Sequence, residues 1–234
     1  MRIAVLVRSP HSEPGSRETL PGLSPGDRAA LATAVGVARE GDEVVALTAG
    51  PAEDEQALAA ALRGGAHRAV RITDPLVKDA DQRTAATILA GGLRVVGFDL
   101  ILTGQRSVDW STGGTGPGVA HMLRLPHVTS VSRVERVENS DDELTLRHRR
   151  GQHLHELSVR LPALLTILEG PTGRVPSTPT SKDLPAIEGV SLAEVTLPFR
   201  KPLITGDRVI LPVDEGPPML DRIDGLLDLI NRWR

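Results

Sequence analysis

The chain has 234 residues, of which 40% are hydrophobic and 24% charged, and these values are typical of a globular protein with a sizeable core. Its formal net charge of −3 gives no electrostatic reason to expect binding to nucleic acid or to an anionic membrane. Because the sequence contains no cysteine, disulfides, thiolate catalysis and zinc sites with cysteine ligands are excluded. Aromatic residues make up only 2% of the chain, so a bound nucleotide would be held mainly by backbone amides and small polar side chains.

The N-terminal segment predicts neither export nor membrane anchoring. Its apolar run, residues 3–7, is too short for a signal peptide and is followed by Pro10. Elsewhere no run approaches the roughly 20 apolar residues that a transmembrane helix requires. We therefore expect a soluble, cytoplasmic protein whose first element is a buried strand.

Short apolar runs alternate with helical patterns over the first part of the chain. Continuous β-prone runs predict strands at residues 3–7, 43–48, 69–72 and 99–103. Apolar residues at helical spacing predict helices at about 31–38, 52–63, 85–96 and 116–124. Apolar strands that alternate with helices predict a doubly wound, mostly parallel α/β sheet with helices on both faces.

The hydrophobic period changes to two between residues 127 and 167. The alternation begins at Val128 and continues across the turn-like segments 139–142 and 149–152. This period predicts antiparallel strands or hairpins that extend the sheet.

After residue 170 the character of the chain changes again. Residues 171–185 contain four prolines and little apolar material, which is typical of an extended loop or arm. An apolar face then predicts a helix at about 217–233, formed by Leu220, Ile223, Leu227, Ile230 and Trp233. This helix docks either on its own domain or on a partner chain, and the sequence leaves both possibilities open. The expected organisation is a nucleotide-binding domain at 1–170, a partner-contacting arm at 171–216 and a C-terminal amphipathic helix at 217–234.

A glycine-rich segment follows the fourth predicted strand. Residues 104–118 have the sequence GQRSVDWSTGGTGPG. Open α/β sheets bind ligands at the carboxyl ends of their strands, at the point where the strand order reverses. In the common doubly wound order this crevice lies between the first and fourth strands. Arg8, at the end of the first strand, would face it.

The composition of this segment suits a phosphate group. Gly113, Gly114 and Gly116 allow a close approach of backbone N–H groups, and Pro117 lies in the first turn of the next helix. Exposed amides at a helix N-terminus carry partial positive charge. Thr115 would either cap this helix or bond to a phosphate. The pattern is equally compatible with an ordinary loop, because glycine-rich turns are common.

Motifs for other chemistry are absent from the sequence. It lacks the P-loop, the dinucleotide fingerprint after the first strand, the nucleophile elbow and the zinc-protease motif. We expect Asp109 to hydrogen-bond a ribose or to stabilise the loop, and Arg106 to pair either with a phosphate or with a surface acid. His148, His153 and His155 are expected to be exposed on a hairpin rather than to bind a metal ion.

Three segments of the sequence resemble one protein family. They are ALTAGPAEDEQALAAALRGGAHRAV at 46–70, DLILTGQRSVDWSTGGTGPGVAHMLRLP at 99–126 and LPALLTILEG at 161–170. In order and character they are similar to the β subunit of electron-transfer flavoproteins. The similarity extends from the first strand to about Glu169.

The resemblance implies a fold, a partner and two cofactors. A subunit of this family has a Rossmann-like fold of the adenine-nucleotide-hydrolase type, pairs with an α subunit, and has no catalytic residues of its own. It binds AMP and helps to enclose an FAD that the α subunit mainly holds. The FAD takes electrons from a dehydrogenase and passes them to an acceptor.

The resemblance also implies the residues that contact AMP. Carried over by position, they are Leu6, Ser24, Pro25, Gly26, Asp27, Ala49, Gly104, Gln105, Arg106, Ser107, Val108, Asp109, Gly113, Gly114 and Thr115. Arg8 stands where the family has a lysine, and is included among the cofactor-binding residues. The chain departs from the family in having Ser24 in place of an asparagine, Gly113 and Gly114 in place of a polar pair, and few basic residues at 170–185.

Two other functions are alternatives. A free-standing regulator that binds adenine nucleotides, resembling the universal stress proteins, would form a homodimer. The long segment after Gly170 disfavours it. A hydrolase or transferase on the same fold is disfavoured because no nucleophile stands at a suitable spacing from a base.

Overall fold

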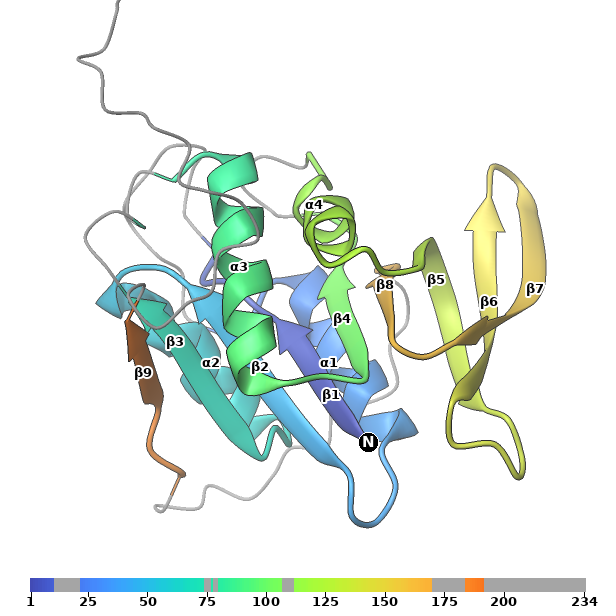
Figure 1. Cartoon of the computed structure of the whole chain (residues 1–234), viewed down its shortest axis with the longest axis horizontal. Helices are drawn as coiled ribbons and strands as arrows, with labels where there is room; N and C mark the ends of the chain where they lie inside the picture. The colour runs from blue at the N-terminus through green and yellow to red at the C-terminus, as the bar shows by residue number, and fades with distance from the viewer. Residues whose placement is uncertain (11–21, 74–76, 78–79, 107–111, 170–183, 192–234) are drawn as a thin grey trace, which may run out of the picture. The chain divides into compact units, whose positions relative to one another are not determined.

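The computed structural model describes residues 1–10, 22–73, 77, 80–106, 112–169 and 184–191. Its centre is a nine-stranded sheet with the order β7-β6-β5-β8-β4-β1-β2-β3-β9 (Figure 1). The parallel strands at its centre are β1 (Arg2–Leu6), β2 (Glu43–Ala49), β3 (Arg68–Thr73), β4 (Leu100–Gly104) and β8 (Ala163–Ile167). Since β2 and β3 follow β1 on one side and β4 returns on its other side, the strand order reverses between β1 and β4. The doubly wound parallel sheet is thus confirmed.

Helices cover both faces of this sheet. They are α1 (Pro25–Val37), α2 (Glu55–Arg63) with the short 3-10 turn η1 (Ala52–Asp54) before it, α3 (Gln82–Val96) and α4 (Thr115–Leu123). In Figure 1, α3 and α4 lie in front of the sheet and α1 and α2 behind it. Within the described residues, none of these helices combines the length and the apolar character needed to cross a membrane.

Alternate residues of each central strand enter separate cores on the two faces. Ile3 and Val5 pack with α1 and α2, whereas Ala4 and Leu6 pack with α3 and α4. All four are at most 5% exposed. Because both faces of a central parallel strand are covered, its sequence is apolar throughout rather than alternating. This is why the sequence predicts these strands well.

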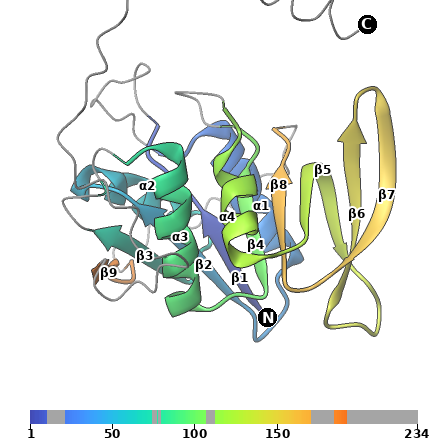
Figure 2. The ribbon, with the colours of Figure 1, turned by 45° about the horizontal axis from the view of Figure 1, so that its top comes forward.

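Strand β5 (His127–Arg136) lies between β8 and β6, and its register is irregular near its start. Its first residues pair in parallel with β8, and from Val131 onward it pairs antiparallel with β6 (Glu143–Arg150). The register shifts between Val128 and Val131, where Ser130 has a φ of 55° in the left-handed region, and Figure 2 shows β5 between β8 and β6. Strands β6 and β7 (His153–Arg160) then form an antiparallel ribbon at one edge of the sheet.

The antiparallel strands predicted between residues 127 and 167 are therefore confirmed for β5, β6 and β7, but not for β8. Strand β8 is parallel to β4 and lies between β4 and β5. All five of its residues, ALLTI, are buried. A continuously buried run is the signature of a central strand, and this distinguishes β8 from the half-exposed ribbon before it.

Part of the segment expected to be an extended arm adds a strand to the sheet. Strand β9 (Glu188–Ser191) pairs in parallel with β3 and forms the edge opposite the ribbon. It belongs to the same compact unit, Met1–Pro198, as the rest of the sheet. The helix predicted at 217–233 lies outside the described residues.

Candidate functional site

A cleft of about 500 Å³ opens at the carboxyl ends of β1 and β4, where the strand order reverses. Leu6 and Arg8 come from the end of β1, and Thr103 and Gly104 from the end of β4. This is the position at which open α/β sheets bind their ligands. Its size lies within the range of small-molecule sites, about 300–1,000 Å³.

Most of the residues predicted to bind a cofactor are brought together in this cleft. Those that line it are Leu6, Arg8, Ser24, Asp27, Ala49, Gly104, Gln105, Arg106, Gly113 and Thr115. Pro25, Gly26 and Gly114 are not among its lining residues. Ser107, Val108 and Asp109 lie outside the described residues, so their placement in the site stays a prediction.

The cleft also has a wall that the sequence does not predict. It is formed by Val77, Ala80, Asp81, Gln82, Ala85 and Leu89, mostly from the beginning of α3. The sequence signal for this wall is the Asp81 cap, which marks where α3 begins. That signal does not show that α3 and α4 start next to each other at the same end of the sheet.

Gly26 and Gly104 bring the start of α1 against the end of β4. A Cβ atom on Gly104 would lie 2.8 Å from the carbonyl carbon of Gly26 and 3.1 Å from the amide nitrogen of Asp27. Both neighbours are backbone atoms that cannot rotate away. Gly104 therefore has to be a glycine for the start of α1 to pack this closely against the end of β4.

Hydrogen bonds hold the start of α1 at the cleft. The Ser24 Oγ caps the helix by accepting from the Asp27 amide at 3.0 Å. The Asp27 Oδ2 in turn accepts from the Arg8 amide at 3.2 Å, which joins the helix to the end of β1. Because its oxygen is engaged as a cap, Ser24 has a structural role that needs no ligand.

The starts of α3 and α4 differ in how they are capped. The Asp81 Oδ1 accepts from the Thr84 amide at 2.7 Å, and the Thr84 side chain together with this amide holds the pKa of Asp81 below its ordinary value. At α4 the N-cap is Gly114, and no side chain caps the helix. Of the two roles left open for Thr115, capping of this helix is wrong, because Thr115 is its first helical residue. The first amide groups of α4 thus keep their capacity to bind an anion.

The charges in the cleft are mixed. Arg8 and Arg106 bring positive charge, and Asp27, Asp54 and Asp81 bring carboxylates, of which Asp54 is only 3% exposed. Among the described lining residues there is no histidine to act as a base toward a serine. The two guanidinium groups give the cleft groups that can bind a polar ligand with an anionic end.

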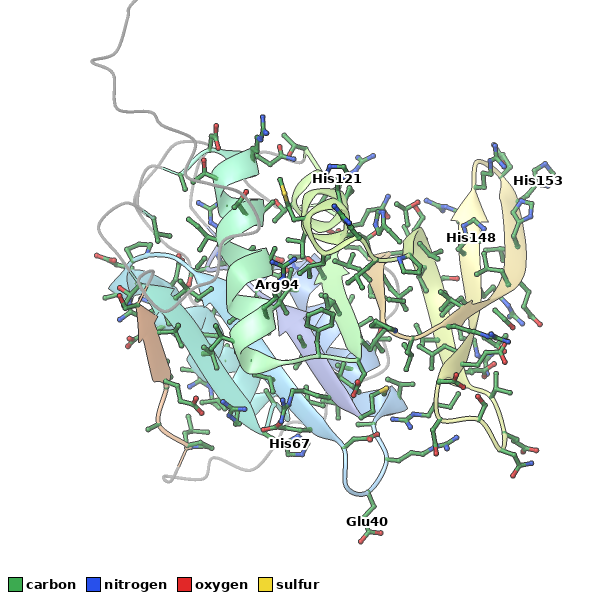
Figure 3. The ribbon with its side chains drawn as sticks, viewed as in Figure 1. Glu40, His67, Arg94, His121, His148 and His153 are labelled. Atoms are coloured by element: carbon green, nitrogen blue, oxygen red, sulfur yellow. The ribbon has the colours of Figure 1, made fainter. Side chains whose placement is uncertain are left out.

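The histidines lie elsewhere, on the β6–β7 ribbon. The ring centres of His148 and His155 are 5.4 Å apart, and those of His153 and His155 are 6.4 Å apart. Figure 3 shows His148 and His153 on the ribbon, away from His121 on α4. Within the described residues no three or more histidine or acidic side chains are arranged to hold a metal ion. His153 and His155 are exposed, as the sequence predicts.

Comparison with known proteins gives the family of the chain. The model of the electron transfer flavoprotein domain matches residues 18–194. Protein FixA of Bradyrhizobium diazoefficiens is 35% identical over 153 residues, which are 63% of this chain and 53% of that protein. The electron transfer flavoprotein subunit beta of Clostridium acetobutylicum is 32% identical over 155 residues, which are 65% of this chain and 59% of that protein. The caffeyl-CoA reductase-Etf complex subunit CarD of Acetobacterium woodii is 34% identical over 158 residues, again 65% and 59%.

The curated relatives and the family model match the chain over different lengths. The chain spans between 53% and 59% of the length of these curated relatives. The family model, in contrast, covers most of the chain, including all the described elements from α1 to β9. The chain therefore belongs to the electron transfer flavoprotein domain family and is similar to its β-type subunits.

Proposed function

We propose that the chain is the β-type subunit of a heterodimeric electron-transfer flavoprotein. It binds AMP in the cleft between β1 and β4 and helps to enclose an FAD held mainly by an α-type subunit. The observation that carries this proposal is the cleft itself. In a chain of this family, it combines a glycine-rich turn with a helix N-terminus that no side chain caps.

The phosphate of AMP would bind at the start of α4. Gly113, with a φ of 64°, gives the turn a shape that other residues adopt only under strain, and the turn leads directly to the uncapped amides. These amides and the positive end of the helix dipole favour an anion. Arg8 and Arg106 line the same cleft and supply compensating positive charge.

The adenosine part of the ligand would lie against the remaining walls. Leu6, Val77 and Leu89 offer apolar surface for the base. Since the described lining contains no aromatic ring, the base is held by aliphatic contact rather than by stacking. We expect Asp109 to hydrogen-bond the ribose, as the family resemblance implies.

In electron transfer, the role of this chain would be to bind AMP and to help enclose the FAD, and it would not itself be oxidised or reduced. The FAD supplies the redox chemistry, taking electrons from a dehydrogenase and passing them to an acceptor. Among the described residues that line the cleft there is no histidine beside a serine, and its arginines suit binding, as a carrier subunit requires. The family match favours this function over the free-standing regulator.

Co-expression tests the proposal. The chain, tagged for purification, is produced together with the α-type subunit encoded nearest to it, and the complex is analysed by gel filtration and visible spectroscopy. We expect a heterodimer with an oxidised-flavin spectrum that dithionite bleaches. A colourless homodimer that ignores the α-type subunit would contradict the proposal and support the regulator.

A further inference from the structure

The side chain of Gln82 lies directly over the start of α4. A Cβ atom built on Gly114 would be 1.6 Å from the Gln82 Nε2, 2.8 Å from its Cδ and 3.2 Å from its Oε1. The amide group of Gln82 thus occupies the space that any side chain at position 114 would need. Gln82 is the first residue of α3, so two helices that start at the same end of the sheet meet at this point.

The Gln82 amide is available to a ligand. Gln82 is exposed and lines the cleft. Its neighbour Asp81 is engaged as the cap of α3, whereas the Gln82 side chain makes no hydrogen bond within the described part of the chain. An amide carries two N–H donors and an acceptor oxygen, and those donors reach toward the N-cap of α4.

The surroundings of this amide indicate which group it would bind. The N-terminal amides of α4 are uncapped, and Thr115 and Gly116 at this helix start line the same cleft as Gln82. An anion placed there would receive hydrogen bonds from the backbone on one side and from Gln82 on the other. The Gln82 amide is a neutral donor on a different helix, so it adds a hydrogen bond to the anion without adding positive charge. Arg8 and Arg106 already supply positive charge in the cleft.

We propose that Gln82 is a phosphate-binding residue of the cleft. Its Nε2 donates a hydrogen bond to the phosphate of a bound nucleoside monophosphate. This inference rests on the proposed function of the cleft as an AMP site. It also accounts for the glycine at position 114, because a side chain there would displace the Gln82 amide from this place.

The proposal predicts which ligands the contact distinguishes. A residue that binds the phosphate strengthens AMP binding and leaves adenosine binding unchanged. A residue that merely supports the fold changes both alike, or changes the melting temperature. The ratio of AMP to adenosine affinity is therefore the informative quantity.

The experiment measures that ratio by calorimetric titration. AMP and adenosine are titrated separately into the purified heterodimer after its bound nucleotide has been removed. We expect Gln82→Ala to weaken AMP binding about tenfold, the lower end for a hydrogen bond to a charged group, and to leave adenosine binding unchanged. Gln82→Glu should weaken AMP binding more, because a carboxylate repels the phosphate. Gln56→Ala is the matched control, an exposed glutamine on α2 that does not line the cleft.

A second variant tests the contact with Gly114. Gly114 has φ −92° and ψ −11°, which alanine adopts without strain, so Gly114→Ala acts by displacing the Gln82 amide. We expect Gly114→Ala to weaken AMP binding as Gln82→Ala does. The double variant should show no further loss, because both changes remove the same contact.

Two results overturn the inference at different levels. If Gln82→Ala and Gln82→Glu bind AMP as tightly as the unmodified protein, or lose AMP and adenosine affinity equally, Gln82 does not bind the phosphate while the AMP site stands. If the unmodified heterodimer binds no AMP, the nucleotide assignment itself fails, and the role of Gln82 fails with it.

Discussion

At the scale of single residues, Gly26 and Gly104 show how a sequence feature serves the fold and the site together. Their backbones touch where α1 meets β4, so a Cβ atom on Gly104 has no room and one on Gly26 would be tightly packed. The glycine at 104 is visible in the sequence as the beginning of a glycine-rich segment. The contact partner is not, because Gly26 precedes it by about 80 residues and belongs to a different element.

Gly104→Ala is expected to lower the free energy of unfolding by about 1–3 kcal/mol, as overpacking at a rigid contact does. The new methyl group would meet the Gly26 backbone at 2.8 Å and push α1 away from the cleft. Denaturant unfolding measures the change. Gly36→Ala is the control: it is exposed near the end of α1 with no atom within 4 Å of the added Cβ, and should raise stability by about 0.5–1 kcal/mol. Equal effects of the two variants would contradict the argument.

Other residues of the site show the limit of sequence analysis. Arg8, Gln105 and Gly113 line the cleft as expected, because each follows or adjoins a strand whose end the apolar pattern marks. Gln82 and Asp54 were not predicted, since their place depends on how two helices start relative to the sheet. A polar residue at a helix start looks the same in sequence whether it faces a ligand or the solvent.

At the scale of elements, ion pairs join the strands near both edges of the sheet to the neighbouring elements. Arg68 on β3 bonds to Glu188 on β9 at 2.8 Å and to Glu43 on β2 at 3.3 Å. Burial by itself would raise the pKa of Glu43, but hydrogen bonds from Arg2 and Arg68 hold it below its ordinary value. The hydrogen bond from Arg68 likewise lowers the pKa of Glu188.

These lowered pKa values predict a pH dependence of stability. Both carboxylates have lower pKa values in the folded than in the unfolded chain, so their contribution is present above about pH 4.5 and is lost as the pH falls through the folded values. Arg68→Gln should therefore reduce the difference in unfolding free energy between about pH 7 and about pH 3.5. Arg94→Gln, at an exposed position on α3 (Figure 3), should leave it unchanged. An undiminished difference in Arg68→Gln would show that β9 is held by other contacts.

Strand β5, which pairs with the antiparallel ribbon, is held by a buried ion pair at its last residue. Arg136 on β5 donates to Asp42, and its Nε bonds to the Val37 carbonyl at the end of α1 at 3.1 Å. The side chains of Arg136 and Asp42 are 8% and 6% exposed. Burial by itself would raise the pKa of Asp42, but its hydrogen bond from the Met1 amine and the charge of Arg136 hold it low.

Asp42→Ala should destabilise the protein by about 3–5 kcal/mol, because it leaves the buried charge of Arg136 without its partner. Asp141→Ala, in the exposed turn before β6, should change stability by less than about 0.5 kcal/mol. Thermal and denaturant unfolding give both values. A small effect of Asp42→Ala would mean that Arg136 finds water or another acceptor when Asp42 is removed.

The elements also show why part of the topology escaped prediction. Strand β8 follows the ribbon in sequence, so its position beside β4 depends on the register shift near Ser130 and on the whole ribbon returning to its starting edge. Strand β9 has only four residues, mostly exposed, and its charged partner Arg68 is 120 positions away in sequence. Neither pairing leaves a local pattern in the chain.

At the scale of the whole molecule, the sequence best predicts those strands and helices that follow a repeating local pattern of apolar residues. The alternation of apolar strands and helices yields the doubly wound sheet, and the end of its fourth strand yields the place of the cleft. The region that matches the family, from 18 to 194, contains the walls of the cleft that follow β1. The identity of the bound nucleotide lies beyond both arguments and needs a direct measurement.

That measurement is the inventory of nucleotides released from the co-purified heterodimer on denaturation, identified and quantified by mass spectrometry. The proposed function predicts one FAD and one AMP for each heterodimer. It also predicts that the AMP content falls in Gln82→Ala and Gly114→Ala while the FAD content stays the same. FAD without AMP, with no AMP bound on titration, would contradict the AMP assignment of the cleft. A chain that carries ATP alone, with no flavin partner, would contradict the electron-carrier function itself.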